Sequence, residues 1–167
     1  MPRSRSLLSL RNCGSSPAMY RFERALLKQT TLTGFSETRE VRFQDVDAAG
    51  IIFYPRVFEF FHDLYVAFLA DAGFPLHEVL RDKTFAAPIR HAEADYFRPL
   101  RFGDQVAVGL VAAHLEPDEV TLGFQLRQHD QVCVVGQTLH TFVDTARFQR
   151  MAIPEPLAQA FGRLRVE

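Results

Sequence analysis

Apolar residues along this 167-residue chain recur with two different periods, and the change between them predicts its elements. From Pro55 to Ala72 they return every three or four residues, the spacing that lines one face of an α-helix. Pro55 is suited to a helix start and Gly73 to a helix end. The pattern predicts one helix of about five turns over residues 55–72, apolar around so much of its circumference that other elements must cover it. Its apolar positions are Val57, Phe58, Phe60, Phe61, Leu64, Tyr65, Phe68, Leu69 and Ala72.

Five other segments alternate apolar residues with polar or small ones, the period of two that is typical of half-buried β-strands. In the first of them, Val41 and Phe43 are expected to point inward. Turn sequences such as EPDE, residues 116–119, separate the later segments, so we expect hairpin-like connections. The strands are predicted over residues 38–44, 91–96, 105–115, 120–128 and 132–144.

The order of these elements favours one fold class. A strand and a turn precede the long helix, about four consecutive strands follow it, and short helices are predicted at 75–80 and after Pro156. We therefore predict an α+β fold in which an antiparallel sheet curls around one central helix. The other face of such a sheet would need a cover, which a second subunit could provide.

The chain is long enough for a single domain with a substantial core, which we place at residues 35–167. Residues 1–34 are expected to be an N-terminal extension that lies largely outside the fold. Residues 1–18 are basic, rich in serine and free of acidic residues, and Met19 offers a second plausible start. A short helix is expected within residues 20–34. Its apolar side would carry Phe22, Ala25, Leu26 and Gln29.

Composition narrows the possible partners. Hydrophobic residues make up 47% and charged residues 23% of the chain, as in soluble globular proteins. The net charge of −1 argues against a nucleic-acid binder, and no apolar run is long enough to suggest a membrane span. Cys13 and Cys133 are far apart in the sequence, which argues against a disulfide framework and fits a reducing cytoplasm. The 16 phenylalanines favour either a Phe-rich core or subunit interface, or a pocket for a flat apolar ligand.

Familiar catalytic and cofactor motifs are absent from the sequence. No GxSxG, GxxxxGK[ST], GxGxxG or HExxH segment occurs. The six histidines show no metal-ligand spacing, and neither cysteine has a CxxC partner. We therefore expect no bound metal and no cofactor.

The stretch RFQDVDAAGIIFYP, residues 42–55, places two carboxylates, Asp45 and Asp47, directly before the most hydrophobic segment of the chain. Free backbone N–H groups near the start of the predicted helix would point toward this turn. Such donors can stabilise a developing oxyanion, and a neighbouring carboxylate can act as a base or a nucleophile. Alternatively, both acids cap the turn and the helix, as Asp often does. The residue types alone leave both interpretations open.

The segment FQDVDAAGIIFYPRVFEFFHDLY resembles the signature Asp-x-Asp-x-x-Gly-[Ile/Val]-[Ile/Val]-aromatic-[Tyr/Phe] of the 4-hydroxybenzoyl-CoA thioesterase family, whose members have the hotdog fold. Downstream, FAAPIRHAEADYFRPLRFGDQVAV is similar to the branch of 1,4-dihydroxy-2-naphthoyl-CoA hydrolases. The resemblance covers residues 38–143 and implies an acyl-CoA thioesterase that forms homodimers or homotetramers with active sites at subunit interfaces. It implies that Asp47 is the catalytic acid and that the Tyr54 backbone amide polarises the thioester carbonyl. It leaves open whether Asp47 attacks the carbonyl or activates water, and Asp45 is expected mainly to orient the turn.

Four further residues are candidates for substrate binding. His91 lies within the second motif, and the alternative is a hydrogen-bonded strand histidine. Arg98 and Arg101 could meet the phosphates of CoA, or they could be ordinary surface residues. Phe53, directly before Tyr54, is the aromatic candidate to line the acyl pocket.

The sequence therefore predicts hydrolysis of an aromatic acyl-CoA, such as a hydroxynaphthoyl or hydroxybenzoyl thioester, in the cytoplasm. One alternative is a thioesterase for medium-chain acyl-CoA or acyl-carrier-protein substrates. Another is a hotdog module that binds a thioester or a partner protein without hydrolysis. The intact Asp47 motif counts against this module, because pure binding needs no carboxylate beside an oxyanion site.

Overall fold

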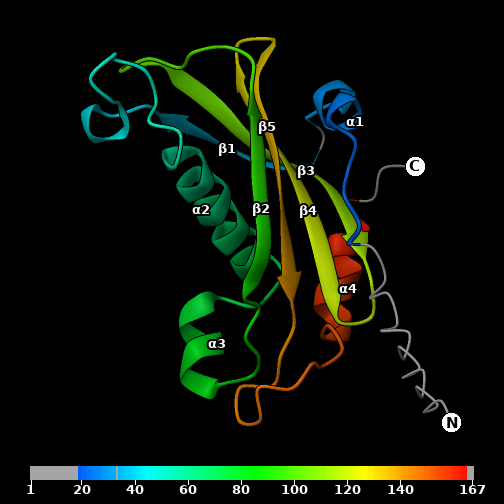
Figure 1. Ribbon diagram of the computed structural model, residues 1–167. Helices are drawn as coiled ribbons and strands as arrows, with labels where there is room; N and C mark the ends of the chain where they lie inside the picture. The colour runs from blue at the N-terminus through cyan, green and yellow to red at the C-terminus, as the bar shows by residue number, and fades with distance from the viewer. Residues whose placement is uncertain (1–18, 33, 165–167) are drawn as a thin grey trace, which may run out of the picture.

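The computed structural model describes residues 19–32 and 34–164, so the predictions for residues 1–18 lie outside the described residues. This part of the chain forms a five-stranded sheet with one long helix on one face and shorter helices around it (Figure 1). None of the helices in these ranges is long and apolar enough to cross a membrane. The elements are α1 (Arg24–Gln29), β1 (Phe35–Glu40), α2 (Arg56–Asp71), α3 (Leu76–Asp82), β2 (Ile89–Tyr96), β3 (Gln105–Leu115), β4 (Glu119–Gln128), β5 (Gln131–Thr141) and α4 (Glu155–Gly162).

The sheet has the strand order β1-β3-β4-β5-β2, and every neighbouring pair is antiparallel. Hairpins join β3 to β4 and β4 to β5, as predicted. The predicted hairpin between β2 and β3 is wrong, because β2 pairs with β5 and residues 97–104 cross the end of the sheet. An extended segment of that length reaches roughly 26 Å, enough to pass two strands that lie about 4.8 Å apart. This order leaves β1 and β2 as the two edges of the sheet.

Helix α2 is the predicted central helix, shortened by one residue at each end. Its side chains Val57, Phe61, Leu64 and Phe68 are buried in the main core. At Gly136 of β5, an added Cβ would collide with the Phe61 ring, so glycine allows the helix to approach the strand closely. The sheet wraps around this helix, and the predicted α+β class is confirmed (Figure 1).

The C-terminal helix α4 extends the same core. Phe161 stacks on Phe68 of α2 with ring centroids 5.2 Å apart, and Leu157 is fully buried. Pro156 lies within the first turn of α4, where its missing N–H leaves no hydrogen bond unmade. Helices α2 and α4 therefore share one face of the sheet.

The first strand differs from the prediction over 38–44. Strand β1 ends at Glu40, and a 3₁₀ turn that contains Phe43 follows it. Phe43 is 78% exposed instead of pointing inward. The carboxylate of Asp45 accepts a hydrogen bond from the Arg42 N–H at 2.9 Å, and this side-chain bond holds the backbone in a turn where the alternation predicted a strand.

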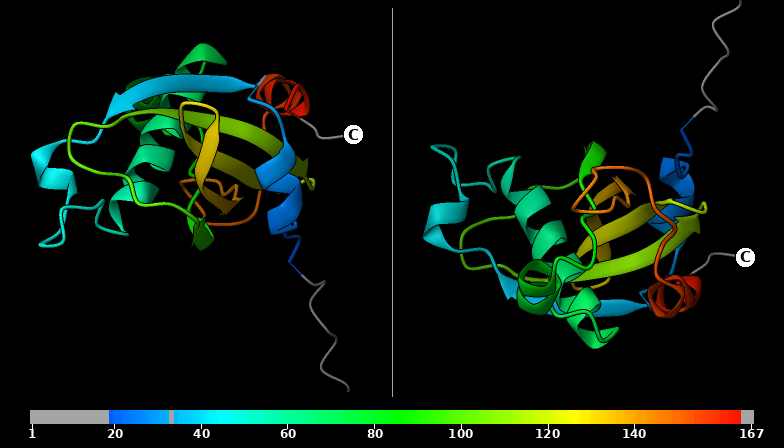
Figure 2. Two further views of the ribbon diagram at one scale, coloured as in Figure 1. Left: turned by 90° about the horizontal axis from the view of Figure 1, so that it is seen from above. Right: turned by 90° about the horizontal axis from the view of Figure 1, so that it is seen from below.

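Part of the N-terminal extension packs against the sheet, so the prediction that it lies outside the fold is wrong for residues 20–32. This N-terminal arm lies across β4 and β5 on the face opposite α2 (Figure 2). Phe22 is buried and Leu27 is 1% exposed. Ala25 and Gln29, which the expected helix face included, are exposed to solvent.

Two buried glutamines fasten the arm to the sheet. The side-chain carbonyl of Gln137 accepts the Phe22 N–H at 2.8 Å, and its Nε2 donates to the Phe22 carbonyl at 3.1 Å. Gln125 Nε2 donates to the Leu27 carbonyl. An added Cβ at Gly123 would collide with the Leu27 side chain, so glycine makes room for the arm. The arm thus covers the face for which the sequence predicted a second subunit.

We expect Leu27→Ala to lower the free energy of unfolding by about 2–5 kcal/mol, the usual cost of truncating a fully buried leucine. Chemical denaturation followed by circular dichroism measures this change. Gln29→Ala, on the exposed side of the same helix, is the matched control and should change stability by no more than about 0.5 kcal/mol. Equally small effects of both substitutions would show that the arm adds nothing to the folded domain.

Candidate active site

The segment DVDAAG forms a tight loop between β1 and α2. A backbone bridge between Val46 and Ile52 closes the loop, and the Asp47 N–H donates to the Ile51 carbonyl at 2.9 Å. Gly50 has a φ of 72°, which is strained for residues with a side chain, and its N–H donates to the Asp47 carbonyl at 2.9 Å. The loop therefore fixes Asp47 within a turn that precedes α2 in the chain.

Asp45 is buried, and its polar groups are used by the loop itself. Its side-chain Oδ2 accepts the Arg42 N–H at 2.9 Å, and Oδ1 lies 3.9 Å from Arg56 Nε. Its backbone carbonyl accepts the Phe53 N–H at 2.8 Å, which fixes the chain just before α2. These contacts are those of a residue that orients the turn, the role expected for Asp45.

Asp47, in contrast, is exposed and sparsely bonded. Its Oδ1 accepts the N–H of Ala49 at 2.8 Å, a bond that fixes the orientation of the side chain. Among the described residues, its carboxylate has no further hydrogen bond and no cationic partner. The remaining lone pairs are free to attack an electrophile or to accept a proton from water.

Tyr54 presents a free backbone donor immediately before α2. Its N–H has no acceptor in the described part of the chain, whereas its carbonyl accepts the hydroxyl of Tyr96 from β2 at 2.7 Å. Burial raises the pKa of the Tyr96 hydroxyl, with a smaller contribution from Tyr54, so Tyr96 stays protonated as the donor. Phe53 is exposed and meets the Tyr54 ring edge to face, with centroids 5.1 Å apart. The expected oxyanion donor and its aromatic neighbour therefore lie together on the surface.

The segment that follows β2 brings an arginine to the loop. Arg101 forms a backbone bridge with Ile51, and the Ile52 N–H donates to the Leu100 carbonyl at 2.8 Å. Arg98 lies on the same segment, and both guanidinium side chains are exposed. The structure thus places Arg101 beside the Asp47 loop, with Arg98 three residues before it.

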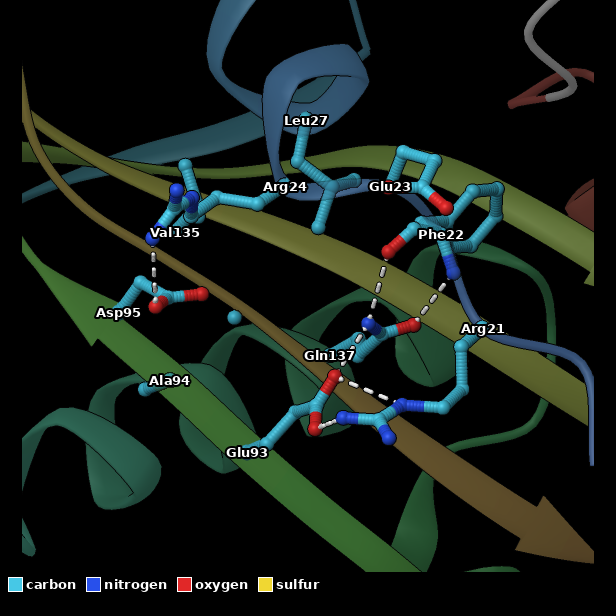
Figure 3. A pocket seen from close by; sticks show the side chains of 11 residues that line it. Arg21, Phe22, Glu23, Arg24, Leu27, Glu93, Ala94, Asp95, Val135 and Gln137 are labelled. Carbon is cyan, nitrogen blue, oxygen red and sulfur yellow. Dashed lines mark hydrogen bonds and ion pairs between the residues drawn. The ribbon is translucent and has the colours of Figure 1, made fainter.

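His91 is not brought to this loop. Its Nε2 lies 3.2 Å from Glu93 Oε2, and Glu93 in turn contacts Arg21 and Gln137 beneath the arm (Figure 3). Side chains alternate between the two faces of a strand, so Tyr96, which reaches the loop, lies on the face of β2 opposite to His91. Within one chain, His91 is therefore a hydrogen-bonded strand histidine away from the Asp47 loop, and its expected substrate-binding role stays a prediction.

A cavity of about 530 Å³ lies between the arm and the β2 edge (Figure 3). Arg21 pairs there with Glu93, and Arg24 lies 3.5 Å from Asp95. These ion pairs neutralise the two carboxylates on the outer face of β2. Across the described ranges, no group of three or more His, Cys, Asp or Glu side chains could hold a metal ion.

Tyr96 was not predicted as a site residue, although it lies in the segment that is similar to the hydrolase branch. The available signal was its place in that segment, directly after Asp95. What the signal lacks is the hydrogen bond to Tyr54, because a contact between residues 42 positions apart depends on the tertiary fold.

Comparison with known proteins shows what this chain is similar to. Residues 41–161 match the sequence profile described as the thioesterase-like superfamily. The 1,4-dihydroxy-2-naphthoyl-CoA hydrolase of Synechococcus elongatus is 33% identical over 120 residues, which cover 71% of this chain and 88% of that protein. The protein of the same name from Rippkaea orientalis is 31% identical over 125 residues, which cover 73% and 91%. The N-terminal arm, which includes α1, lies outside the residues that match the profile.

Solved structures have the same fold. The 1,4-dihydroxy-2-naphthoyl-CoA thioesterase from Synechocystis superposes with a TM-score of 0.72 at 24% identity, covering 78% of this chain and 96% of that one. A gentisyl-coenzyme A thioesterase superposes with a TM-score of 0.68 at 29% identity, covering 75% and 98%. The predicted hotdog architecture is confirmed.

Proposed function

Because the chain belongs to the thioesterase-like superfamily, we propose that it hydrolyses an aromatic acyl-CoA thioester to the free acid and CoA. The observation that carries this proposal is the exposed, unpaired carboxylate of Asp47 in the loop that leads to the free N–H of Tyr54. The names of the similar proteins, which denote dihydroxynaphthoyl and gentisyl thioesters, support an aromatic acyl group.

In the proposed reaction, the thioester carbonyl oxygen accepts the Tyr54 N–H, which stabilises the negative charge that develops on that oxygen. Asp47 either attacks the carbonyl carbon to give an acyl anhydride that water then hydrolyses, or it takes a proton from a water molecule that attacks directly. In both routes the C–S bond breaks and CoA leaves as its thiolate, which is then protonated. Tyr96 holds Tyr54 in place through its hydrogen bond to the carbonyl.

The CoA part of the substrate is proposed to lie along the segment after β2. Arg98 and Arg101 are exposed there and carry the positive charge that phosphates require. Phe53 flanks the carbonyl site and offers an apolar surface. The chemistry needs only water, a carboxylate and an N–H donor, so the proposal includes no metal or cofactor. A cytoplasmic location is also proposed, and Cys133, a free buried thiol, fits a reducing compartment.

We propose further that the chain forms a homodimer through edge strand β2. This strand spans eight residues and one of its edges has no partner in the described chain, an arrangement that invites pairing with a second copy. An antiparallel β2 pair would bring the Glu93 and Asp95 carboxylates of both chains together, and Arg21 and Arg24 neutralise this charge. The arm occupies the outer face over β4 and β5, which favours a dimer over a tetramer built through that face.

Replacing Asp47 by Asn should lower kcat by at least roughly 100-fold, because it removes the anionic oxygen while keeping the size of the side chain. Release of free thiol from an aromatic acyl-CoA measures this rate. Asp45→Asn is the control, since its amide oxygen can still accept the Arg42 N–H, and it should keep most of the activity. Near-normal turnover in Asp47→Asn together with an inactive Asp45→Asn would reverse the two assignments.

Substrate choice is tested with 4-hydroxybenzoyl-CoA, 1,4-dihydroxy-2-naphthoyl-CoA and octanoyl-CoA. We expect kcat/KM for at least one aromatic substrate to exceed that for octanoyl-CoA by about 10-fold or more, the discrimination that pocket shape commonly provides. Octanoyl-CoA is the comparator because an apolar cavity of about 510 Å³ beside α2 and α3 could accept a linear chain. Equal or better hydrolysis of octanoyl-CoA would favour the medium-chain alternative, and no thiol release from any substrate would favour the binding module.

Light scattering at micromolar concentration should give twice the chain mass of 19.0 kDa. Ala92→Lys, at an exposed position of β2, should shift the protein toward monomers, since a lysine on an edge strand opposes pairing. Ser36→Lys makes the same kind of change at an exposed position of β1, the other edge, and should leave the dimer intact. A monomeric wild type would contradict the proposed assembly.

A further inference from the structure

The hydroxyl of Tyr65 on α2 is a buried polar group without a hydrogen-bond partner among the described residues. The residue is 5% exposed, and burial raises the pKa of its phenol, so the hydroxyl stays protonated at neutral pH. Buried polar groups are rarely left unpaired, because they lose their bonds to water without replacing them. Phenylalanine would fill nearly the same space without this penalty. The stability of the fold therefore gives no reason for the hydroxyl.

A cavity of about 70 Å³ adjoins this tyrosine between α2 and β2. Its walls are almost entirely apolar and include the rings of Phe58, Phe61 and Phe124. Ala92 lines the side toward the edge of the sheet and is exposed, so a paired β2 strand would complete the enclosure. Flat aromatic walls of this kind suit one edge of an aromatic ring.

The other buried polar groups on the cavity wall already have partners. Burial lowers the pKa of His140 to about 4, against the opposing effect of its hydrogen bond to Ala87, so the imidazole is neutral at pH 7. Its Nδ1 lies 3.2 Å from the Ala87 carbonyl and donates to it, and its Nε2 accepts the Thr138 hydroxyl at 2.8 Å. This arrangement uses both ring nitrogens of the histidine. Tyr65 differs from His140 and Thr138, because its hydroxyl can still donate one hydrogen bond and accept another.

Within one chain, Tyr65 lies far from the Tyr54 donor. Helix α2 rises about 14 Å from Arg56 to Tyr65, at about 1.5 Å per residue, which is longer than a single aromatic acyl group. In an antiparallel pair of β2 strands, the Ile89 end of one strand lies beside the Tyr96 end of the other. Ile89 lines the cavity and Tyr96 contacts Tyr54, so the proposed dimer brings the cavity of one subunit to the Asp47 loop of its partner.

We propose that the Tyr65 hydroxyl binds a hydroxyl group on the acyl ring, on the side remote from the carbonyl, and thereby selects hydroxylated aromatic thioesters. This inference rests on the proposed function and on the β2 dimer. The phenol of Tyr65 and the ring hydroxyl can each donate and accept, so the pair satisfies the group that the folded chain leaves unbonded. A ring without the hydroxyl would leave Tyr65 unpaired in a cavity whose walls are almost entirely apolar.

The test assays wild type and Tyr65→Phe with 4-hydroxybenzoyl-CoA and benzoyl-CoA, two substrates that differ by one ring hydroxyl. Wild-type kcat/KM should be roughly 10-fold higher for the hydroxylated substrate, the effect of about one good hydrogen bond. Tyr65→Phe should abolish this preference by lowering kcat/KM for 4-hydroxybenzoyl-CoA, with that for benzoyl-CoA unchanged or higher. Tyr20→Phe, the same chemical change on the outer face where Tyr20 stacks on His114, is the control and should keep the preference.

Thermal unfolding supplies a readout that does not depend on catalysis. Tyr65→Phe should melt at the same temperature as wild type or at a higher one, because the substitution removes an unpaired buried hydroxyl. A clear drop in Tm would mean that the hydroxyl stabilises the fold, and it would overturn the inference.

Binding of two inert analogues separates this inference from the proposed function. In phenacyl-CoA and 4-hydroxyphenacyl-CoA, a methylene group between sulfur and carbonyl prevents hydrolysis, and calorimetry compares their affinities. If wild type hydrolyses neither thioester but binds the hydroxylated analogue more tightly through Tyr65, the proposed function fails and the inference stands. If wild type hydrolyses both thioesters and Tyr65→Phe changes both rates equally or not at all, the inference fails and the proposed function stands.

Discussion

Burying the broad apolar surface of α2 is the constraint on which the rest of this structure depends. A helix that is apolar around most of its circumference cannot rest on a flat surface, so the sheet curls around it and α4 closes the remaining side. The close contact of Phe61 with Gly136 and Phe124 shows how tightly the two layers meet. Only the ends of such a helix can present backbone groups to solvent, and the N-terminal end presents donors. The candidate site therefore lies where α2 begins.

The same constraint explains why two aspartates two residues apart have different surroundings. Asp45 faces the packed start of the helix, where a carboxylate is tolerated only if its oxygens are bonded, and the Arg42 N–H provides such a bond. Asp47 lies on the solvent side of the turn, where water can solvate a charge that the protein leaves unpaired. The unused hydrogen-bonding capacity of Asp47, more than its position in a motif, is the reason we propose it as the reactive one of the pair.

Local periodicity predicted the elements whose own residues carry a continuous apolar pattern. Helix α2 was predicted to within one residue at each end, because its apolar stripe is continuous and Pro55 and Gly73 mark its limits. The arm could not be predicted in this way, since the features that hold it are Gly123, Gln125 and Gln137 on strands about a hundred residues away. The route of residues 97–104 across the sheet likewise depends on which strands pair, and hydrophobic alternation does not show the pairing.

The candidate site was predictable as far as its residues share one motif. Asp47, Tyr54 and Phe53 lie within ten residues of each other, so the motif alone placed them together. The alternation of β2 was recognised, but a strand pattern shows which residues share a face and not which face meets the loop of the same chain, so the role expected for His91 stays a prediction. Tyr65 gave no signal at all, since a tyrosine within an apolar helical stripe is indistinguishable in sequence from an ordinary core residue.

Buried polar groups on the two faces of the sheet differ in whether they have hydrogen-bond partners. We use this difference to distinguish structural from functional positions. On the outer face, Gln125 and Gln137 are buried and both bond the backbone of the arm, so each amide contributes to the fold that hides it. On the inner face, the hydroxyl of Tyr65 is buried to a similar degree and bonds nothing in the described chain. A buried polar atom without a hydrogen bond lowers the stability of the fold. Its partner is therefore expected to come from another molecule. The inner face, next to the strand edge that a second subunit would complete, is therefore where the ligand's own polar group is expected.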